Sequence, residues 1–285
     1  MKKGLTKICV DELRLIFFFE NPLYIYSYNH KQILMQKLFF SWAFCLSFIA
    51  FGQQNLLFEQ TFIHAEDVGA YDEYLKSDFI KIAQARLDAG AIVGWDVWKA
   101  VPNQNLDFTH MVTTITDITD DKDYELNYNE MLGMSEERAE MFNDNVAKIR
   151  TIKRRQLWNI LANIDGNGSA KIGKAPQFMV LNLMKVRELK NYSKYEQLEI
   201  ANTSKIEEGD ARVAWTLHRR LDNLGTDVYY THTTIDWFDN WKDFIKSNMG
   251  PSVGPKEWPK AWSEMDKIRD LRNRVMLWKY LEVKK

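Results

Sequence analysis

Three histidines are the side chains of this sequence with the most obvious capacity for chemistry. The segments 214–220 and 229–238 read as two antiparallel strands, and side chains alternate between the two faces of a strand. With the turn placed near residues 223–225, position 218 lies opposite position 230 and position 216 opposite position 232. This pairing predicts one shared face, which carries Thr216, His218, Arg220, Tyr230 and His232. The other face then carries Trp215, Leu217, Tyr229 and Thr231.

The same alternation places a second group of side chains on the matching face of segment 94–112. That group is Asp96, Trp98, Phe108, His110 and Val112. Imidazoles beside a phenol and a guanidinium can bind an anionic or aromatic ligand, ligate a metal or move protons. The candidate ligand-binding residues are therefore His218, Tyr230, His232, Arg220, His110 and Trp98. The alternative is that these histidines are core residues with satisfied hydrogen bonds. His64 ends the first predicted strand and is expected at the surface or rim.

Other catalytic and metal-binding patterns find no support in the sequence. It contains no HExxH, Walker A, GxGxxG or GxSxG motif, so no catalytic residue, metal site or cofactor is predicted. The run DGNGSAKIG at 165–173 lacks the acidic residue that closes a calcium loop. The two cysteines, Cys9 and Cys45, lie in segments that we expect to be absent from the mature protein. A mature chain without cysteine has no thiolate chemistry.

The charge balance excludes one class of partner. With 38 Lys and Arg against 39 Asp and Glu, the formal net charge is −1, which gives no electrostatic footprint for nucleic acid. The 10 tryptophans and 12 tyrosines instead suggest a core or cavity lined with aromatic rings. A small-molecule ligand is the partner that this composition favours.

The N-terminal region reads as an export signal preceded by an extension. From Met35 the chain has one lysine at position 37, an apolar run over 38–51, and small residues at 50 and 52 before Gln53. This is the pattern of a secretory signal peptide, and the run is too short for a transmembrane helix. We therefore predict a mis-annotated extension at 1–34, a signal peptide at 35–52 and an exported protein without a stable membrane span.

The rest of the chain contains an internal duplication. Segment 94–118 aligns with 214–238 without a gap, so that Trp95 falls on Trp215 and Asp107 on Asp227. The pairs of tyrosines in YDEY (71–74) and YSKY (192–195) also correspond, as do KIRTIKRRQLWNIL (148–161) and KIRDLRNRVMLWKYL (267–281). Three matches in the same order predict two copies of one unit. We place repeat 1 at 53–164, a linker at 165–176 and repeat 2 at 177–285.

Each repeat has the element order βαββαβ, which is that of a ferredoxin-like unit. Strand-like openings at 56–65 and 178–186 precede helical segments near 68–89 and 189–208. A strand pair, a helical region and a closing strand follow, with the closing strands at 156–164 and 275–283. The predicted fold class is α+β, with two tandem ferredoxin-like units.

The segment FMVLNLMKVRELKNYSKYEQLEI (178–200) resembles the opening strand and helix of the dimeric α+β barrel superfamily. That superfamily includes antibiotic-biosynthesis-type monooxygenases, haem-degrading monooxygenases and NIPSNAP-like proteins. The resemblance covers residues 55–284 in element order and includes no catalytic motif. It implies that two sheets pack face to face around a shared interior, here within one monomer with internal pseudo-symmetry.

Two functions are compatible with this reading. The first is an exported monooxygenase-like protein that binds or oxidises a small aromatic or hydrophobic molecule inside the barrel. The alternative is a non-catalytic binding or structural protein whose barrel packs its own core. Such folds carry unrelated functions, so the interior must distinguish them: a cavity with convergent polar groups favours a ligand, and a filled interior favours the alternative.

Overall fold

The computed structural model describes residues 56–119, 129, 132–165, 176–203, 210–223, 227–249 and 260–284. They belong to one compact unit, Gly52–Lys285. The predicted extension and signal peptide, and all of the predicted linker except its two end residues, lie outside the described residues. No helix in the described ranges is long and apolar enough to cross a membrane.

The two halves of the described chain have the same order of elements. The first contains β1 (Leu56–Ala65), α2 (Val68–Tyr74), the π-helical turn η1 (Leu75–Phe79), α3 (Ile80–Asp88), β2 (Gly94–Ala100), β3 (His110–Asp117), α5 (Glu136–Ile149) and β4 (Arg150–Asp165). The second contains β5 (Phe178–Val186), the 3₁₀ turn η2 (Leu189–Asn191), α6 (Tyr192–Thr203), β6 (Ala214–Arg220), β7 (His232–Phe238), α7 (Trp241–Met249), α8 (Lys260–Asp266) and β8 (Arg269–Lys284). Both halves therefore follow the predicted βαββαβ order.

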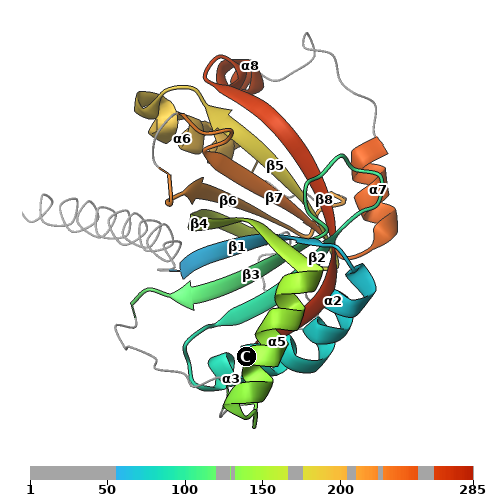
Figure 1. The fold of residues 1–285 in the computed structure, drawn as a ribbon. Coiled ribbons are helices and arrows are strands. Elements are labelled where there is room, and N and C mark those ends of the chain that lie inside the picture. Colours follow the sequence, from blue (N-terminus) through green and yellow to red (C-terminus); the bar gives the residue numbers. More distant parts are fainter. Residues whose placement is uncertain are drawn as a thin grey trace, which may run out of the picture. The chain divides into compact units, whose positions relative to one another are not determined.

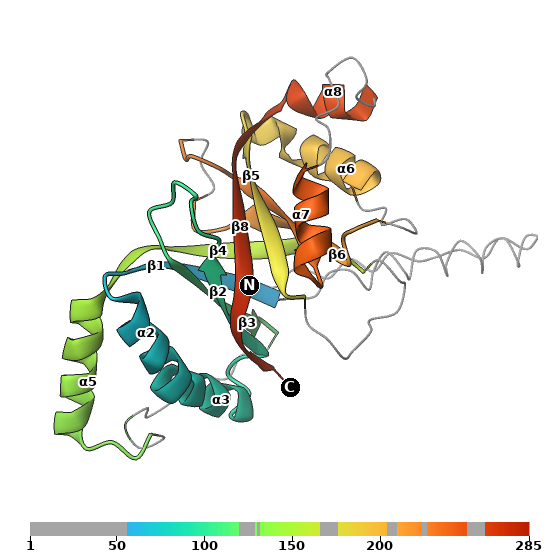
Figure 2. The same ribbon diagram turned by 90° about the vertical axis from the view of Figure 1, so that its right-hand side faces the viewer.

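The eight strands form one closed barrel in the order β1-β3-β2-β8-β5-β7-β6-β4. Within it, β4-β1-β3-β2 and β8-β5-β7-β6 each have the strand order of a ferredoxin-like sheet. The two sheets meet where β2 pairs with β8 and β4 pairs with β6. Helices α2, α3 and α5 cover one sheet, and α6, α7 and α8 lie on the outside of the other (Figures 1 and 2). The predicted fold is confirmed.

Local sequence signals explain where several elements begin and end. Asp67 caps α2 by accepting a hydrogen bond from the Ala70 amide, and Ser135 caps α5 in the same way through Arg138. Glu136 and Glu137 then lie in the first turn of α5, where the helix dipole favours negative charge. Gly90 follows α3 with a φ of 83°, a left-handed conformation that glycine adopts without strain.

The barrel wall separates an interior core from three outer cores, two of which contain the repeated tryptophans. The interior core contains Phe58, Phe62, Trp98, Phe108, Met111, Trp158, Met179, Leu181, Leu183, Tyr230, Ile235, Val275 and Leu277. One outer core lies beneath the helices of repeat 1 and includes Trp95, and another lies beneath those of repeat 2 and includes Trp215. Each of these tryptophans is the second residue of the second strand of its repeat. The two therefore occupy equivalent positions, as the duplication predicted.

A buried carboxylate on β2 yields the first testable prediction. Burial raises the pKa of Asp96 to about 6, against the opposing influence of Lys279, whose ammonium lies 3.7 Å away. Because the folded pKa exceeds the unfolded value, this group makes the protein less stable as pH rises from about 4 to 6, and the loss persists above pH 6.

We therefore expect Asp96→Asn to stabilise the protein at pH 7.5 by on the order of 2 kcal/mol and to change little at pH 4. Lys279 keeps a carboxylate partner in the variant, since Glu282 lies 3.2 Å from it. Urea unfolding at the two pH values measures the difference. A variant less stable than wild type at pH 7.5 would show that the ion pair outweighs the cost of burial.

Candidate ligand cavity on the outer face of the repeat 2 sheet

The predicted face assignment of the histidines was wrong. His218 lies opposite Thr233, and Thr216 lies opposite Ile235, so the true pairing differs from the expected one by three residues. An odd shift moves one strand's side chains to the other face. His218 and Tyr230 consequently do not share a face with His232, which packs beneath the helices.

The same correction applies to repeat 1. Trp98 lies opposite Met111, and both side chains belong to the interior core. His110 therefore points to the helix side, where its ring lies 5.0 Å from that of Tyr71. Val112 packs against the outer core of repeat 1, whereas Phe108 lies in the interior.

His110 joins the sheet of repeat 1 to its first helix. Its Nε2 lies 3.0 Å from Asp72 Oδ1 on α2, and its Nδ1 lies 2.8 Å from the Thr109 hydroxyl. Lys99 donates to the other oxygen of Asp72 at 2.6 Å. Burial alone would raise the pKa of the Asp72 carboxyl, but its hydrogen bonds with Lys99 and His110 hold that pKa below its usual value. An ionised carboxylate only accepts hydrogen bonds, so Nε2 carries the proton and Nδ1 accepts from the threonine.

His232 makes the same contacts in repeat 2. Its Nε2 lies 3.0 Å from Glu196 Oε1 on α6, and its Nδ1 lies 2.9 Å from the Thr231 hydroxyl. Arg219, aligned with Lys99 in the sequence repeat, donates to Glu196 at 3.3 Å. Burial lowers the pKa of both His110 and His232, which keeps the imidazoles neutral. Each histidine thus has both ring nitrogens bonded within its own repeat, as the alternative reading of these residues expected.

This shared network also corrects the alignment of the first helices. In repeat 1 the carboxylate follows Tyr71, and in repeat 2 it follows Tyr195. Both tyrosine rings lie 5.0 Å from the histidine of their repeat. Tyr71 is therefore the counterpart of Tyr195 rather than of Tyr192. The added turn η2 before α6 accounts for the difference, because it lengthens the connection by three residues.

His218 is buried inside the barrel. Its Nε2 lies 2.8 Å from the Thr216 hydroxyl, and its ring centroid lies 4.9 Å from that of Phe58. Burial lowers the pKa of His218 to about 3, so this imidazole is neutral. Trp98 also lies inside, with the Lys279 ammonium 4.9 Å from its ring centroid.

Tyr230 and Arg220 line a pocket of about 530 Å³, which we call the barrel-mouth pocket. The Tyr230 hydroxyl donates to Gln156 at 2.8 Å, and its ring stacks on Trp158. The Arg220 guanidinium lies 5.5 Å from the Tyr230 ring centroid and donates two hydrogen bonds to Asp222. Burial lowers the pKa of Arg220, but the Asp222 carboxylate outweighs burial and raises it. These are the two members of the predicted set that the structure brings to a pocket. Their role in ligand binding stays a prediction.

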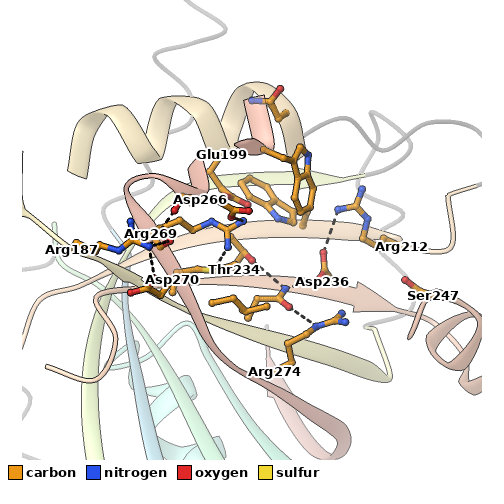
Figure 3. A pocket seen from close by; sticks show the side chains of 16 residues that line it. Arg187, Glu199, Arg212, Thr234, Asp236, Ser247, Asp266, Arg269, Asp270 and Arg274 are labelled. Atoms are coloured by element: carbon orange, nitrogen blue, oxygen red, sulfur yellow. Dashed lines mark hydrogen bonds and ion pairs between the residues drawn. The ribbon is translucent and has the colours of Figure 1, made fainter. Parts of the chain in front are cut away.

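A larger cavity, of about 780 Å³, lies on the outer face of the repeat 2 sheet, and we call it the repeat 2 cavity (Figure 3). It is lined by Asn182, Met184, Arg187, Glu199, Asn202, Arg212, Trp215, Thr234, Asp236, Ser247, Trp262, Asp266, Arg269, Asp270, Leu271 and Arg274. The barrel wall separates the two pockets, because Asn182 faces this cavity while its neighbour Leu183 lines the barrel-mouth pocket.

Most charges of the repeat 2 cavity are neutralised within it or at its edge. Arg212 forms ion pairs with Asp210 at 2.7 Å and with Asp236 at 3.3 Å. Arg187 pairs with Asp270 at 2.5 Å. Figure 3 shows the pairs Arg212–Asp236 and Arg187–Asp270. Arg274 donates to the Asn182 amide oxygen at 3.0 Å. The polar wall is therefore held in place by its own contacts.

Arg269 is bonded less completely. The residue is 6% exposed, its NH1 donates to the Met184 sulfur at 3.4 Å, and Asp266 lies 3.7 Å from NH2, beyond hydrogen-bond distance. The Arg269 Nε and the indole Nε1 of the fully buried Trp215 have no hydrogen-bond partner among the described residues. Neither atom is accessible to solvent, so both belong to the packed wall rather than to the open part of the cavity.

Repeat 1 shows the same position completed by a hydrogen bond. Arg150 is the counterpart of Arg269 in the matching KIR sequences. Its NH1 donates to the Tyr71 hydroxyl at 2.9 Å, and its guanidinium lies 4.7 Å from the Phe79 ring centroid. In repeat 2 the equivalent Tyr195 hydroxyl is buried beside the Glu199 carboxylate and makes no hydrogen bond to Arg269. The bond between arginine and tyrosine that closes repeat 1 is therefore absent from the described part of repeat 2.

The sequence did not predict this cavity, because no motif marks it. Its arginines come from three separate segments, and only the fold brings them together. The KIR match was visible and placed Arg269 opposite Arg150 in the alignment. That match alone could not show that one arginine is bonded to a tyrosine and the other is not.

Comparisons with known proteins show similarity in structure only. No protein-family model matches the chain, and no curated protein matches it in sequence. A proposed monooxygenase from Lactobacillus acidophilus NCFM aligns at 12% identity with a TM-score of 0.49, over 81% of this chain and 96% of the other. A variant of the chlorite dismutase from Candidatus Nitrospira defluvii aligns at 9% identity with a TM-score of 0.42, over 80% and 92% of the two chains. A haem-binding protein from Thermus thermophilus aligns at 8% identity with a TM-score of 0.44, over 80% and 92%.

The closed barrel and its strand order define the class of protein. The chain has the fold of the dimeric α+β barrel superfamily, with both ferredoxin-like units on one polypeptide. A shared fold does not carry a shared activity.

The residues of the repeat 2 cavity do not fit a haem group. Haem iron is held by an imidazole, thiolate, thioether or phenolate. Among the described residues that line the cavity there is no histidine or cysteine. The Met184 sulfur already accepts a hydrogen bond from the Arg269 guanidinium, whose positive charge would oppose an iron ion there. The nearby His232 has both ring nitrogens bonded within the protein.

Proposed function

We propose that this protein binds a small organic molecule in the repeat 2 cavity. The observation that carries the proposal is the difference between the two repeats. Beneath the helices of repeat 1 the space is filled by a cluster of buried hydrophobic residues that includes Tyr71, Leu75 and Trp95. In repeat 2 the corresponding cluster, which includes Tyr195 and Trp215, is bordered by a cavity of about 780 Å³, within the size range of small-molecule sites.

The polar wall supports binding rather than incomplete packing. An empty cavity in a protein is normally apolar, whereas this one has four arginines and four carboxylates on its wall. The arginines are Arg187, Arg212, Arg269 and Arg274. Placing these groups around empty space would cost stability that a ligand with matching polar groups restores.

A pair of pocket-filling variants tests the site. Asn202 on α6 lines the repeat 2 cavity, and Asn273 on β8 lines the barrel-mouth pocket. We expect native mass spectrometry of the protein purified from its own host to show a retained small molecule. Asn202→Trp should abolish retention by filling the cavity, and Asn273→Trp should leave it unchanged. Absence of any retained molecule in the wild type, or its loss from Asn273→Trp alone, would contradict the proposal.

We also propose that the protein acts after export. The support is the basic residue Lys37 followed by the apolar run at 38–51 and the small residues before Gln53. N-terminal sequencing of the native protein is expected to begin near Gln53. A native N-terminus at or before residue 34 would contradict both the signal peptide and the predicted start at Met35.

A further inference from the structure

We propose that the barrel-mouth pocket is a second binding site, for a neutral molecule whose carbonyl oxygen accepts a hydrogen bond from the side-chain amide of Gln156. This site is independent of the repeat 2 cavity, which lies on the other side of the barrel wall. The inference follows from an amide donor that is held in place and left unbonded, from the apolar floor beside it and from the pairing of the charges at the rim.

The amide of Gln156 is fixed in orientation while its donor is left unbonded. The residue is 2% exposed and lines the pocket. Its Oε1 accepts a hydrogen bond from the Tyr230 hydroxyl at 2.8 Å, so the tyrosine determines which side of the amide carries the oxygen. The Nε2 donates to no described residue and retains accessible surface, unlike the enclosed Nε2 of Gln60 at the paired position of β1. A ligand that satisfies this donor must bring an acceptor atom.

The floor of the pocket is apolar. Leu183 and Val275 belong to the interior core, Leu106 packs against that core, and all three line the pocket. The Tyr230 ring lines it as well, and it stacks on Trp158 with 5.9 Å between the two ring centroids. A ligand whose acceptor reaches Gln156 therefore needs an apolar body that can pack against these side chains.

The charges at the rim call for no counter-ion. Arg154 NH1 donates to both carboxylate oxygens of Asp107, at 2.8 and 2.7 Å. Arg220 donates from Nε and NH2 to the two oxygens of Asp222, at 2.9 and 2.8 Å. Because each guanidinium already has its own carboxylate, an anionic ligand would have to compete for it. A neutral carbonyl compound meets the remaining requirement, which is an acceptor for the Gln156 amide.

Two probes of matched shape test the inference. In α-methylstyrene a methylene group replaces the carbonyl oxygen of acetophenone. Since the hydrocarbon is also the more hydrophobic probe, the quantity compared between variants is the ratio of the two dissociation constants, measured by NMR titration. Gln156→Glu at pH 8 keeps an acceptor for the Tyr230 hydroxyl but removes the N–H donors, and Gln156→Met removes both. We expect either variant to reduce the relative preference for acetophenone about fivefold or more.

Asn273→Trp and Asn202→Trp are the matched controls, with one substitution in each pocket. Asn273→Trp should weaken binding of both probes by filling the barrel-mouth pocket, whereas Asn202→Trp should leave both dissociation constants unchanged. The inference is overturned if neither probe binds the wild type, if the ratio is the same in the wild type and both Gln156 variants, or if Asn202→Trp alone abolishes binding. None of these results changes what the repeat 2 cavity retains, so failure here is distinct from failure of the proposed function.

Discussion

Replacing His218 by leucine is expected to remove a large part of the acid sensitivity of this protein. His218 is buried among interior side chains, and burial lowers its pKa to about 3 in the folded state, whereas an unfolded histidine titrates near 6.5. Between these values the unfolded chain binds a proton that the folded chain does not. Stability therefore falls with decreasing pH, by about 1.4 kcal/mol per pH unit for this group.

Urea unfolding at pH 7, 5.5 and 4 measures this effect. The wild type should lose on the order of 3 kcal/mol through His218 between pH 7 and pH 4, and His218→Leu should lose that much less. His110→Gln is a useful comparison, because His110 also has a lowered pKa but is bonded to the Asp72 carboxylate. An unchanged pH dependence in His218→Leu would mean that this imidazole is accessible to protons in the folded protein.

The second expected result is that the same substitution has unequal effects in the two repeats. Tyr71→Phe removes the hydroxyl that accepts a hydrogen bond from the Arg150 guanidinium at 2.9 Å. Because this buried bond involves a charged group, its loss should lower the free energy of unfolding by about 1.5–3 kcal/mol. Tyr195→Phe removes a buried hydroxyl that makes no hydrogen bond to Arg269 and at most a weak one to the Glu199 carboxylate, so it should cost less stability than Tyr71→Phe.

Chemical denaturation of the two variants checks this asymmetry, and each serves as the other's control. Equal losses of stability would show that Tyr195 is bonded as Tyr71 is. The difference between the arginine–tyrosine contacts of the two repeats would then be removed.

The fold could be predicted from the sequence because its signals are redundant. The repeated Trp95 and Trp215, the shared KIR sequences and the two apolar opening strands each specify the same element order. Cap residues such as Ser135 also mark helix starts locally. A closed barrel then follows, because two ferredoxin-like sheets on one chain can bury their open faces against each other.

The residues of the site could not be predicted in the same way, because they depend on strand register. The equal spacing within the repeats suggested equal hairpins. However, Trp95 lies opposite Thr114, whereas Trp215 lies opposite Asp236 rather than Thr234. The second hairpin has therefore slipped by two residues relative to the first. Such a slip keeps the same side chains on the same face, so no hydrophobic pattern reveals it.

Burial of the histidines was predictable, but their partners were not. The carboxylates bonded to His110 and His232 lie 38 and 36 residues earlier in the chain, on helices whose docking no local pattern specifies. The repeat 2 cavity depends in the same way on how α6, α7 and α8 pack against the sheet. Tertiary packing therefore determines both the histidine contacts and the ligand site.

A crystal structure of the protein isolated from its own host, with whatever small molecule it retains, tests the central claim most directly. The account predicts a molecule in the repeat 2 cavity, against lining side chains such as Asn202 and Arg212. A retained molecule in the barrel-mouth pocket beside Tyr230 and Arg220, with the repeat 2 cavity empty, would contradict it.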